Sequence, residues 1–398
     1  MRIIEINSFV IGSTGNIMLN IASKARAQNN EVYIFCANTR RNSNVDISKE
    51  CMIGTRIERK LHIWLSQFTG FNGCFSWFST YGFLRKADKI DPDIVHLHNL
   101  HNSYINLPMF FKWIKKNNKK VIWTLHDCWA FTGQCPHFIV AKCGKWKTGC
   151  FNCPRYKEYP ESLFDRTKTM YKLKKKWFTG VENLTIVTPS NWLANLVKQS
   201  FLRDYPVKVI NNGIDLNIFK PIESEFKKEH NIEDKKVLLG CASPWSDRKG
   251  LDVFIKLSDM LSEDYKIVLV GLSKEQLETL PKNIIGIERT NNQTELAEIY
   301  TMADVFVNPT REDNFPTVNI EALACGTPVI TFNKGGSPEI IDETCGCVVK
   351  CDDVVSLKNE IVRVCEEKPY SREDCIIRAA QFDMNDKFKE YVDLYDNI

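Results

Sequence analysis

Two cations and two acids stand near the starts of expected helices in the C-terminal half of the chain. Arg248 and Lys249 end the loop SPWSDRKG, directly before an expected helix. Two cations beside a helix start suit a diphosphate, through Coulomb attraction and charge-assisted hydrogen bonds. The stretch at 310–330, TREDNFPTVNIEALACGTPVI, opens with an acidic turn containing Asp313 and carries Glu321 on the next helix. A helix start there favours an anionic or hydroxyl-rich ligand, and a solvated surface connection is the alternative.

Histidines stand at the carboxyl ends of two expected strands in the N-terminal half. The strand at 93–99 contains His98, and the strand at 119–125 is followed by His126 and Asp127. Ligands of open parallel sheets bind outside the carboxyl ends of the strands. Both histidines therefore stand where chemistry would be placed, and a structural role is the alternative for each.

The chain begins with a strand at 2–10, the small-residue turn GSTGN at 12–16 and a helix. This arrangement can cradle a phosphate, or it can be an ordinary tight connection. A second strand at 31–36 completes a βαβ unit. No acid ends that strand, and Arg40 and Arg41 follow it, which argues against NAD and leaves NADP open.

Five of the 15 cysteines fall within about 26 residues, beginning at Cys128. Cys150 and Cys153 have the spacing of a zinc knuckle, and Cys135 and Cys143 would complete a four-thiolate site. The wider spacings are not a metal signature. Free thiols packed in an irregular loop are therefore the alternative to a structural metal.

Length and composition favour two packed domains in a reducing compartment. The chain has 398 residues, of which 43% are hydrophobic. The apolar start suits a buried strand better than a secretory segment, so a cytoplasmic protein is expected. Residues 1–220 carry 32 Lys and Arg against 15 Asp and Glu, or +17, and the remainder carries 21 against 34, or −13. This asymmetry predicts a boundary near 220 and a basic first domain that suits nucleic acid, anionic lipid or phosphorylated substrates.

An uncharged stretch at 61–84 is crowded with Trp, Phe and Tyr. It predicts either a buried aromatic cluster or an interfacial helix, because its serines and glycines make it a poor membrane span. A basic amphipathic helix expected at 164–178 could lie on an anionic membrane or form a solvated face.

Strands and helices alternate along both halves, which predicts two parallel sheets. A charged linker is expected at 223–236, and the last helix at 386–395. Expected strands beyond those above are 184–187, 207–210, 237–242, 266–270, 284–287 and 304–308.

With these residues assembled, the chain resembles glycosyltransferase family 4. The resemblance rests on GSTGN at 12–16, LHD at 125–127, INNGIDLNIF at 210–219, RKG at 248–250 and the stretch at 310–330, with GGSPEII at 335–341. Within that family, the chain resembles enzymes of exopolysaccharide, capsule and O-antigen biosynthesis. This closer resemblance rests on the segments HDCWAFTGQC and ASPWSDRKG.

The resemblance implies the GT-B architecture, two Rossmann-like domains with parallel sheets facing across a cleft. It assigns acceptor binding to residues 1–218 and nucleotide-sugar binding to 219–379. A C-terminal helix at about 380–398 is expected to pack back onto the first domain.

The resemblance also implies roles for individual residues. His126 would contact the transferred sugar, and Lys249 with Arg248 would stabilise the departing diphosphate. Glu321 would bind the ribose, and Asp313 stands where the family has a first glutamate, with seven residues between the pair. Further donor-binding positions are Gly12, Ser13, Asn314, Phe315 and Thr317. Ser243 occupies a place where the family often has an arginine.

The implied reaction is retaining transfer from a UDP- or GDP-sugar, without a required cofactor or essential metal. The expected acceptor is a glycan, lipid-linked through polyprenyl diphosphate, at the inner face of the plasma membrane. Two alternatives from other classes are an NADP-dependent oxidoreductase and a nucleic-acid-binding protein, although no nucleic-acid partner is predicted.

Overall fold

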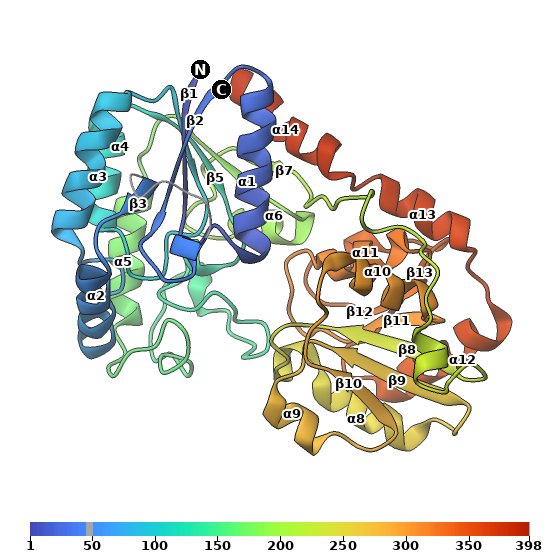
Figure 1. Ribbon diagram of the computed structural model, residues 1–398. Helices are drawn as coiled ribbons and strands as arrows, with labels where there is room; N and C mark the ends of the chain where they lie inside the picture. The colour runs from blue at the N-terminus through green and yellow to red at the C-terminus, as the bar shows by residue number, and fades with distance from the viewer. Residues whose placement is uncertain (45–50, 398) are drawn as a thin grey trace. The chain divides into compact units, whose positions relative to one another are not determined.

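The computed structural model describes residues 1–44 and 51–397, which fold into two compact units (Figure 1). The first unit comprises Met1–Ile210 and Phe388–Ile398, and the second comprises Asn211–Lys387. Each unit is a parallel sheet covered by helices, so the predicted α/β class with two Rossmann-like domains is confirmed. The chain passes from the first unit to the second after Ile210. The boundary expected from the sequence lies eight residues later, after residue 218.

The first unit contains a seven-stranded sheet in the order β3-β2-β1-β4-β5-β6-β7. All of its strand pairs are parallel, as the βαβ pattern predicts. Its strands are β1 Arg2–Asn7, β2 Glu31–Ala37, β3 Met52–Ile53, β4 Ile94–Leu97, β5 Lys120–Thr124, β6 Leu184–Thr188 and β7 Val207–Val209. Its helices are α1 Gly12–Ala27, α2 Arg56–Thr69, α3 Trp77–Ile90, α4 Leu107–Lys116, α5 Thr167–Phe178, α6 Asn191–Val197 and α14 Met384–Asp396.

Alternate residues of β1 face opposite sides of this sheet. Ile4 and Ile6 belong to an aromatic-rich core with α4 and α5, in which Phe111 and Phe178 lie 4.6 Å apart. Glu5 points the other way, towards α14, the face that also carries α1 (Figure 1). Tyr391 and Tyr395 bury this last helix against the first unit, as the sequence predicts.

The uncharged aromatic stretch forms α2 and α3, and its large side chains are not a buried cluster. On α2 the outward face carries four exposed apolar residues at helical spacing: Ile57, Leu61, Trp64 and Phe68. On α3 the exposed aromatics are Trp77, Phe78 and Tyr81. The expectation of burial is therefore wrong for these side chains. Phe83 on α3 does enter the core, but the other buried residues of the two helices are His62 and smaller side chains. We call these seven residues the α2–α3 apolar surface.

The second unit contains a six-stranded parallel sheet in the order β10-β9-β8-β11-β12-β13. Its strands are β8 Lys236–Cys241, β9 Tyr265–Val270, β10 Ile284–Ile287, β11 Val305–Asn308, β12 Val329–Phe332 and β13 Gly346–Val349. Its helices are α7 Phe226–Glu229, α8 Leu251–Met260, α9 Lys274–Thr279, α10 Gln293–Met302, α11 Thr317–Ala324, α12 Val354–Glu367 and α13 Arg372–Ala380. The short helix α7 interrupts the segment predicted to be a linker.

Both faces of the second sheet are buried. On β8, Val237 and Leu239 enter one core cluster, while Leu238 enters the other. This explains why β8 reads as a continuous apolar run rather than an alternating one. Among the described residues, no helix has both the length and the apolar character needed to cross a membrane.

Candidate active site

The loop between β8 and α8 presents Arg248 and Lys249 in a short 3-10 helix, Asp247–Lys249. Gly250 follows with a φ of +78°, and a Cβ there would lie 2.5 Å from the carbonyl oxygen of Pro309. Glycine is therefore needed where this loop meets the loop that follows β11. The Arg311 N–H donates to the Arg248 carbonyl at 2.8 Å and ties the two loops together.

Lys249, Arg248 and Asp313, all candidate site residues of the sequence, lie together at this junction. The Lys249 ammonium is 2.5 Å from Asp313 Oδ2, and both side chains remain partly exposed. The Arg248 guanidinium donates to the Glu312 carbonyl at 2.6 Å and lies 4.0 Å from the Asp313 carboxylate. Two cations thus share one acid in a position that an anionic ligand can compete for.

Arg311 supports this junction and was not predicted from the sequence. Its guanidinium donates to both carboxylate oxygens of Asp252, each at 2.8 Å, and to Asp352 at 2.7 Å. The same arrangement lowers the pKa of Asp252. A bidentate pair of this kind fixes the loop after β11 against the start of α8.

Glu321 and Thr317 occupy the same face of α11, one turn apart. The Tyr300 hydroxyl donates to Glu321 Oε2 at 3.1 Å, and Thr317 also bonds to this carboxyl. Burial raises the pKa of Glu321 above its usual range, although both hydrogen bonds oppose the shift. Hydroxyl groups of a ligand that donate hydrogen bonds to this buried carboxyl would stabilise its ionised form.

The turn at Gly335 and Gly336 holds the backbone at Asp313. The Gly336 N–H donates to the Asp313 carbonyl at 3.0 Å. Gly335 has a φ of +64°, and a Cβ there would meet the same carbonyl at 1.9 Å. The next two residues, Asn314 and Phe315, are buried. Glycine is thus required at position 335 by a close backbone approach, which explains its place in the sequence.

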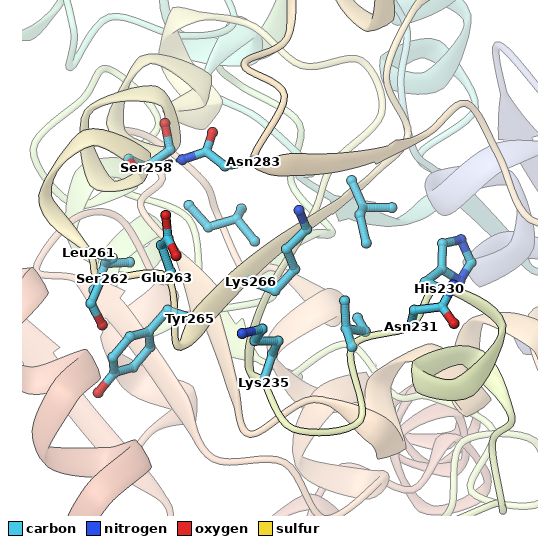
Figure 2. Close-up of a pocket in the computed structure, with 13 residues that line it drawn as sticks. His230, Asn231, Lys235, Ser258, Leu261, Ser262, Glu263, Tyr265, Lys266 and Asn283 are labelled. Carbon is cyan, nitrogen blue, oxygen red and sulfur yellow. Dashed lines mark hydrogen bonds between the residues drawn. The ribbon is translucent and has the colours of Figure 1, made fainter.

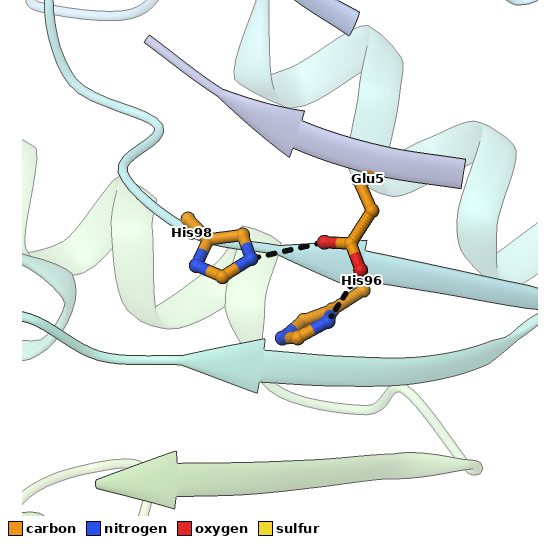
Figure 3. A group of neighbouring side chains, drawn as sticks. All are labelled: Glu5, His96 and His98. Atoms are coloured by element: carbon orange, nitrogen blue, oxygen red, sulfur yellow. Dashed lines mark hydrogen bonds and ion pairs between the residues drawn. The ribbon is translucent and has the colours of Figure 1, made fainter. Parts of the chain in front are cut away.

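In the first unit, Glu5 lies between two histidines on β4 and just beyond it (Figure 3). Its carboxylate is 3.1 Å from His96 Nδ1 and 3.0 Å from His98 Nε2, and all three side chains are fully buried. The Tyr395 hydroxyl donates to Glu5 Oε1 at 2.8 Å. Burial alone would raise the pKa of Glu5, but the histidines outweigh it and lower the pKa to about 2. The carboxylate is ionised because its acceptor oxygens are satisfied.

His98 connects Glu5 to His126. His98 Nδ1 lies 3.0 Å from His126 Nε2, and the two rings stack at 5.3 Å. Burial lowers the pKa of His98 to about 4 and that of His126 well below its usual value, so both are neutral near pH 7. Because His98 Nε2–H donates to Glu5, its Nδ1 must accept from His126 Nε2–H. The chain of bonds therefore assigns His126 the tautomer whose Nδ1 carries no proton.

A second set of bonds surrounds Asp127, the neighbour of His126. His101 Nε2 lies 3.0 Å from Asp127 Oδ2, and the Trp129 N–H donates to the same carboxylate at 2.8 Å. His101 Nδ1 lies 2.6 Å from the Tyr159 hydroxyl. Burial raises the pKa of Asp127, but His101 overcomes that effect and lowers it to about 2. Glu5, His101 and Tyr159 had no sequence signal, since their partners are distant in the chain.

Gly12 and Ser13 form the first turn of α1 at the carboxyl end of β1. Gly12 has a φ of +77°, which favours glycine. Asn7 Nδ2 donates to Thr14 Oγ1 at 3.4 Å and links the strand end to the helix. Parallel strands place this turn and the histidines at one edge of the sheet.

Potential metal ligands come together at one place among the described residues. The ligand atoms of Glu5, His96 and His98 all lie within 4.8 Å of one another. Among the described residues the four predicted cysteine ligands do not form such a group, and no disulfide joins any of the cysteines. A hydrogen bond from Cys135 lowers the pKa of Cys153 to about 7. The four-cysteine metal site stays a prediction.

A cavity of about 580 Å³ in the second unit is lined by none of these residues. Figure 2 shows the residues that line it. It is lined by Lys235, Tyr265, Lys266 and Asn283, at the amino ends of β8, β9 and β10. Ligands of such sheets bind at the opposite edge, where Lys249 and Asp313 stand. We therefore do not assign the donor to this cavity.

Comparisons with known proteins agree with the geometry of both units. Residues 14–218 match the sequence profile described as Glycosyltransferase Family 4, and residues 222–382 match that of Glycosyl transferases group 1. The putative colanic acid biosynthesis glycosyl transferase WcaC of Escherichia coli K12 is 27% identical over 319 residues, covering 77% of each chain. The N,N'-diacetylbacillosaminyl-diphospho-undecaprenol alpha-1,3-N-acetylgalactosaminyltransferase of Campylobacter jejuni is 28% identical over 247 residues, covering 58% of this chain and 63% of its own.

Among solved structures, Anabaena HepE in complex with UDP-glucose matches with a TM-score of 0.67 and 14% identity, covering 100% of both chains. This likeness establishes the GT-B fold, and the sequence match extends the result from fold to family. Because the Family 4 profile spans more than half of the 398 residues, the protein belongs to glycosyltransferase family 4.

Proposed function

We propose that the protein transfers a hexose-type sugar from a UDP- or GDP-sugar to a lipid-linked glycan during surface polysaccharide synthesis, with retention of configuration. The observation that carries this proposal is the junction of Arg248, Lys249 and Asp313, with Glu321 on the adjacent helix. Two cations for a diphosphate and a carboxylate for a ribose are the groups that a nucleotide sugar requires. The names of relatives support the choice of pathway and acceptor: one concerns colanic acid, and another an undecaprenol diphosphate. HepE supports the choice of donor, since it was solved with UDP-glucose.

Charge develops in two places as the sugar leaves the diphosphate. The leaving group gains negative charge, which Lys249 and Arg248 are expected to stabilise without an essential divalent metal. The sugar becomes oxocarbenium-like, and His126, held neutral, is expected to accept a hydrogen bond at Nδ1 from a hydroxyl group. The departing phosphate takes the acceptor's proton, so the new bond forms on the face that the diphosphate leaves.

Asn314, Phe315 and Thr317 remain proposed donor contacts, through backbone N–H groups and the Thr317 hydroxyl. Gly12 and Ser13 are proposed to approach the donor phosphates. Domain roles follow the same proposal: acceptor binding belongs to residues 1–218 and donor binding to 219–379, with the last helix completing the first domain.

Transfer from a panel of UDP- and GDP-sugars to short polyprenyl-diphosphate-linked saccharides tests the proposal. We expect a product with one of the donors. The NMR coupling constant of the transferred sugar should show the same anomeric configuration as in that donor. The rates with and without EDTA should be equal. An inverted product would overturn retention. Loss of activity in EDTA that Mg²⁺ restores would overturn metal independence.

The α2–α3 apolar surface supports a peripheral contact with a membrane that presents the acceptor. Exposed basic residues on the same two helices include Arg56, Lys60, Arg85 and Lys86, which suits anionic lipid. We expect the protein to sediment with anionic vesicles and less with neutral ones. The double variant Trp64→Ser, Phe68→Ser should lose this binding, whereas Ile377→Ser, which changes an exposed residue of the second unit, should keep it.

The NADP-dependent oxidoreductase and nucleic-acid-binding alternatives are not favoured, because neither accounts for the match of both units to glycosyltransferases. Thermal shifts with UDP, GDP, NADPH and RNA separate the three functions. We expect stabilisation by UDP or GDP; stabilisation by NADPH or RNA alone would overturn the proposal.

A further inference from the structure

A cavity of about 270 Å³ that is lined mainly by polar residues opens in the first unit beside α2. Amide and hydroxyl side chains, which both donate and accept hydrogen bonds, dominate its lining, and one guanidinium and one carboxylate are also present. The polar residues of the lining include Arg59, Gln67, Asn72, Asn102, Tyr159 and Glu161. Its volume falls just below the range of roughly 300–1,000 Å³ typical of ligand pockets, which suits a single small unit. Amides and hydroxyls mixed in this way match the hydroxyl groups of a sugar.

Two polar atoms of this lining are buried without a hydrogen-bond partner among the described residues. They are Arg59 Nε, a donor, and Asn72 Oδ1, an acceptor. Buried polar atoms in folded proteins are nearly always paired, so each such atom indicates a missing partner. Both residues line the cavity, and a sugar bound there supplies groups that accept from one and donate to the other once these side chains turn towards it.

The wall of the cavity is bonded to the strand end that carries His126. Tyr159 donates to Asn102 Oδ1 at 2.7 Å, and its hydroxyl lies 2.6 Å from His101 Nδ1. His101 in turn bonds to Asp127, which follows His126 in the chain. The cavity and the predicted catalytic histidine therefore belong to one hydrogen-bonded region of the first unit.

An apolar cavity of about 450 Å³ adjoins the polar one and shares Gln67 and Glu161 with it. Trp64, Phe68 and Leu163 line it, and the rings of Trp64 and Phe68 stack 5.8 Å apart. Both aromatic residues belong to the α2–α3 apolar surface. Hydrogen-bonding residues in the first cavity and stacked aromatic rings in the second suit an amphiphile better than a free sugar.

We propose that the Arg59–Asn72 cavity binds a saccharide unit of the acceptor, with the acceptor's lipid part on the adjoining Trp64–Phe68 cavity. This subsite rests on the proposed transfer to a lipid-linked glycan. It adds where the acceptor binds, which residues select it, and on which side of the saccharide its lipid part lies.

Binding of synthetic glycosides to the full chain tests the subsite directly. The probes are methyl and decyl glycosides of common hexoses and N-acetylhexosamines, with decyl phosphate as the lipid control. We expect at least one decyl glycoside to bind about tenfold or more tightly than its methyl counterpart and than decyl phosphate, as judged by calorimetry. Equal binding of decyl phosphate and every decyl glycoside would mean that the chain alone is recognised, which overturns the saccharide site.

Arg59→Met and Asn72→Leu remove the two unpaired groups. We expect each to weaken glycoside binding on the order of tenfold, the cost of one lost hydrogen bond. Asn72→Leu should keep or raise the Tm, because it removes an unpaired buried acceptor, whereas a structural asparagine would lower it. Lys112→Ala, which changes an exposed residue of α4 that lines neither cavity, is the control and should change neither quantity.

Calorimetry with UDP and GDP on the same variants separates this inference from the proposed function. Unchanged nucleotide binding with weakened glycoside binding supports the subsite. Failure of every glycoside to bind a protein that still transfers sugar would show that water alone fills the cavity, and would overturn the subsite while leaving the proposed function intact. Failure of both nucleotides to bind the wild-type protein would count against the proposed function itself.

Discussion

The two units hold their charged groups in opposite ways. In the second unit, the side chains of Lys249 and Asp313 form an ion pair that keeps 17% and 19% of their surface exposed. In the first unit, Glu5 and its two histidines have no exposed surface at all. A partly exposed pair can exchange one partner for a ligand, whereas a buried and fully bonded cluster cannot do so without unfolding around it.

This difference indicates different tasks for the two sets of residues. Under the proposed function, the ion pair neutralises Lys249 in the free protein, and a diphosphate replaces Asp313 as its anionic partner. The buried cluster meets no ligand itself but fixes the tautomer of His126 through His98. Substitutions should therefore change ligand binding in the second unit, and stability together with histidine protonation in the first.

Lys249→Ala should have the largest effect on transfer. Losing one preorganised cation lowers the rate on the order of 10²-fold or more, because charge on the leaving group is no longer stabilised. Initial rates at saturating donor measure it. Lys256→Ala, which removes a lysine paired with Asp252 on the adjacent helix, is the matched control. Turnover like that of the wild type in Lys249→Ala would remove the ion pair from the site.

Glu5→Gln should act mainly on stability. An ionised acceptor of three hydrogen bonds becomes neutral, and we expect a loss of about 2 kcal/mol in the free energy of unfolding at pH 7. Folding lowers the pKa of Glu5 to about 2, so its contribution is complete above its ordinary pKa of 4.5 and disappears as the pH falls towards 2.

Urea unfolding of Glu5→Gln and the wild-type protein at pH 7, 5 and 3.5 measures this difference. The gap between them should shrink at the lowest pH. NMR of the histidine side chains should also show His126 losing its single tautomer in the variant. A constant gap, with the tautomer of His126 unchanged, would contradict the positioning role.

The two sheets and the candidate residues of the second unit could be predicted from the sequence, because local sequence patterns mark them. The two parallel sheets follow from alternating apolar runs and helix periodicity, and β10 begins and ends where predicted. Lys249 and Asp313 were found through their loops and a family resemblance. The sequence shows Gly335 only as part of the GGSPEII segment. The structure shows why glycine is needed there, because a Cβ would meet the Asp313 carbonyl.

Contacts between distant parts of the chain were not predictable. Glu5 and Tyr395 are 390 residues apart, and nothing local to either marks it as half of a buried pair. Arg311 fixes the loop after β11 through Asp252 and Asp352, and no spacing rule in the sequence marks these partners. The aromatic stretch at 61–84 was misjudged because composition does not show which face of a helix meets the core.

Glu321→Ala should weaken nucleotide binding on the order of tenfold, through one lost hydrogen bond to a charged group. Because burial raises the pKa of Glu321, the wild-type affinity should rise with pH as this carboxyl loses its proton. Calorimetry with UDP and GDP from pH 5 to 8 measures both effects, and Glu321→Gln should show a weaker pH dependence. Unchanged affinity in Glu321→Ala would contradict the ribose contact.

Asp313→Asn should give the smallest change and the sharpest distinction between the two units. If Asp313 occupies Lys249 until the diphosphate arrives, removing its charge should tighten nucleotide binding about two- to fivefold, the scale of a partly exposed ion pair. The gain should shrink in high salt, because screening weakens the pair that is being removed. Transfer should fall in the same variant, since the residue that faces the donor sugar has lost its charge, and Asp313→Glu should restore it. Weaker nucleotide binding in Asp313→Asn would show that this acid positions Lys249 as Glu5 positions His98, and the contrast between an exchangeable and a fixed charge would then fail.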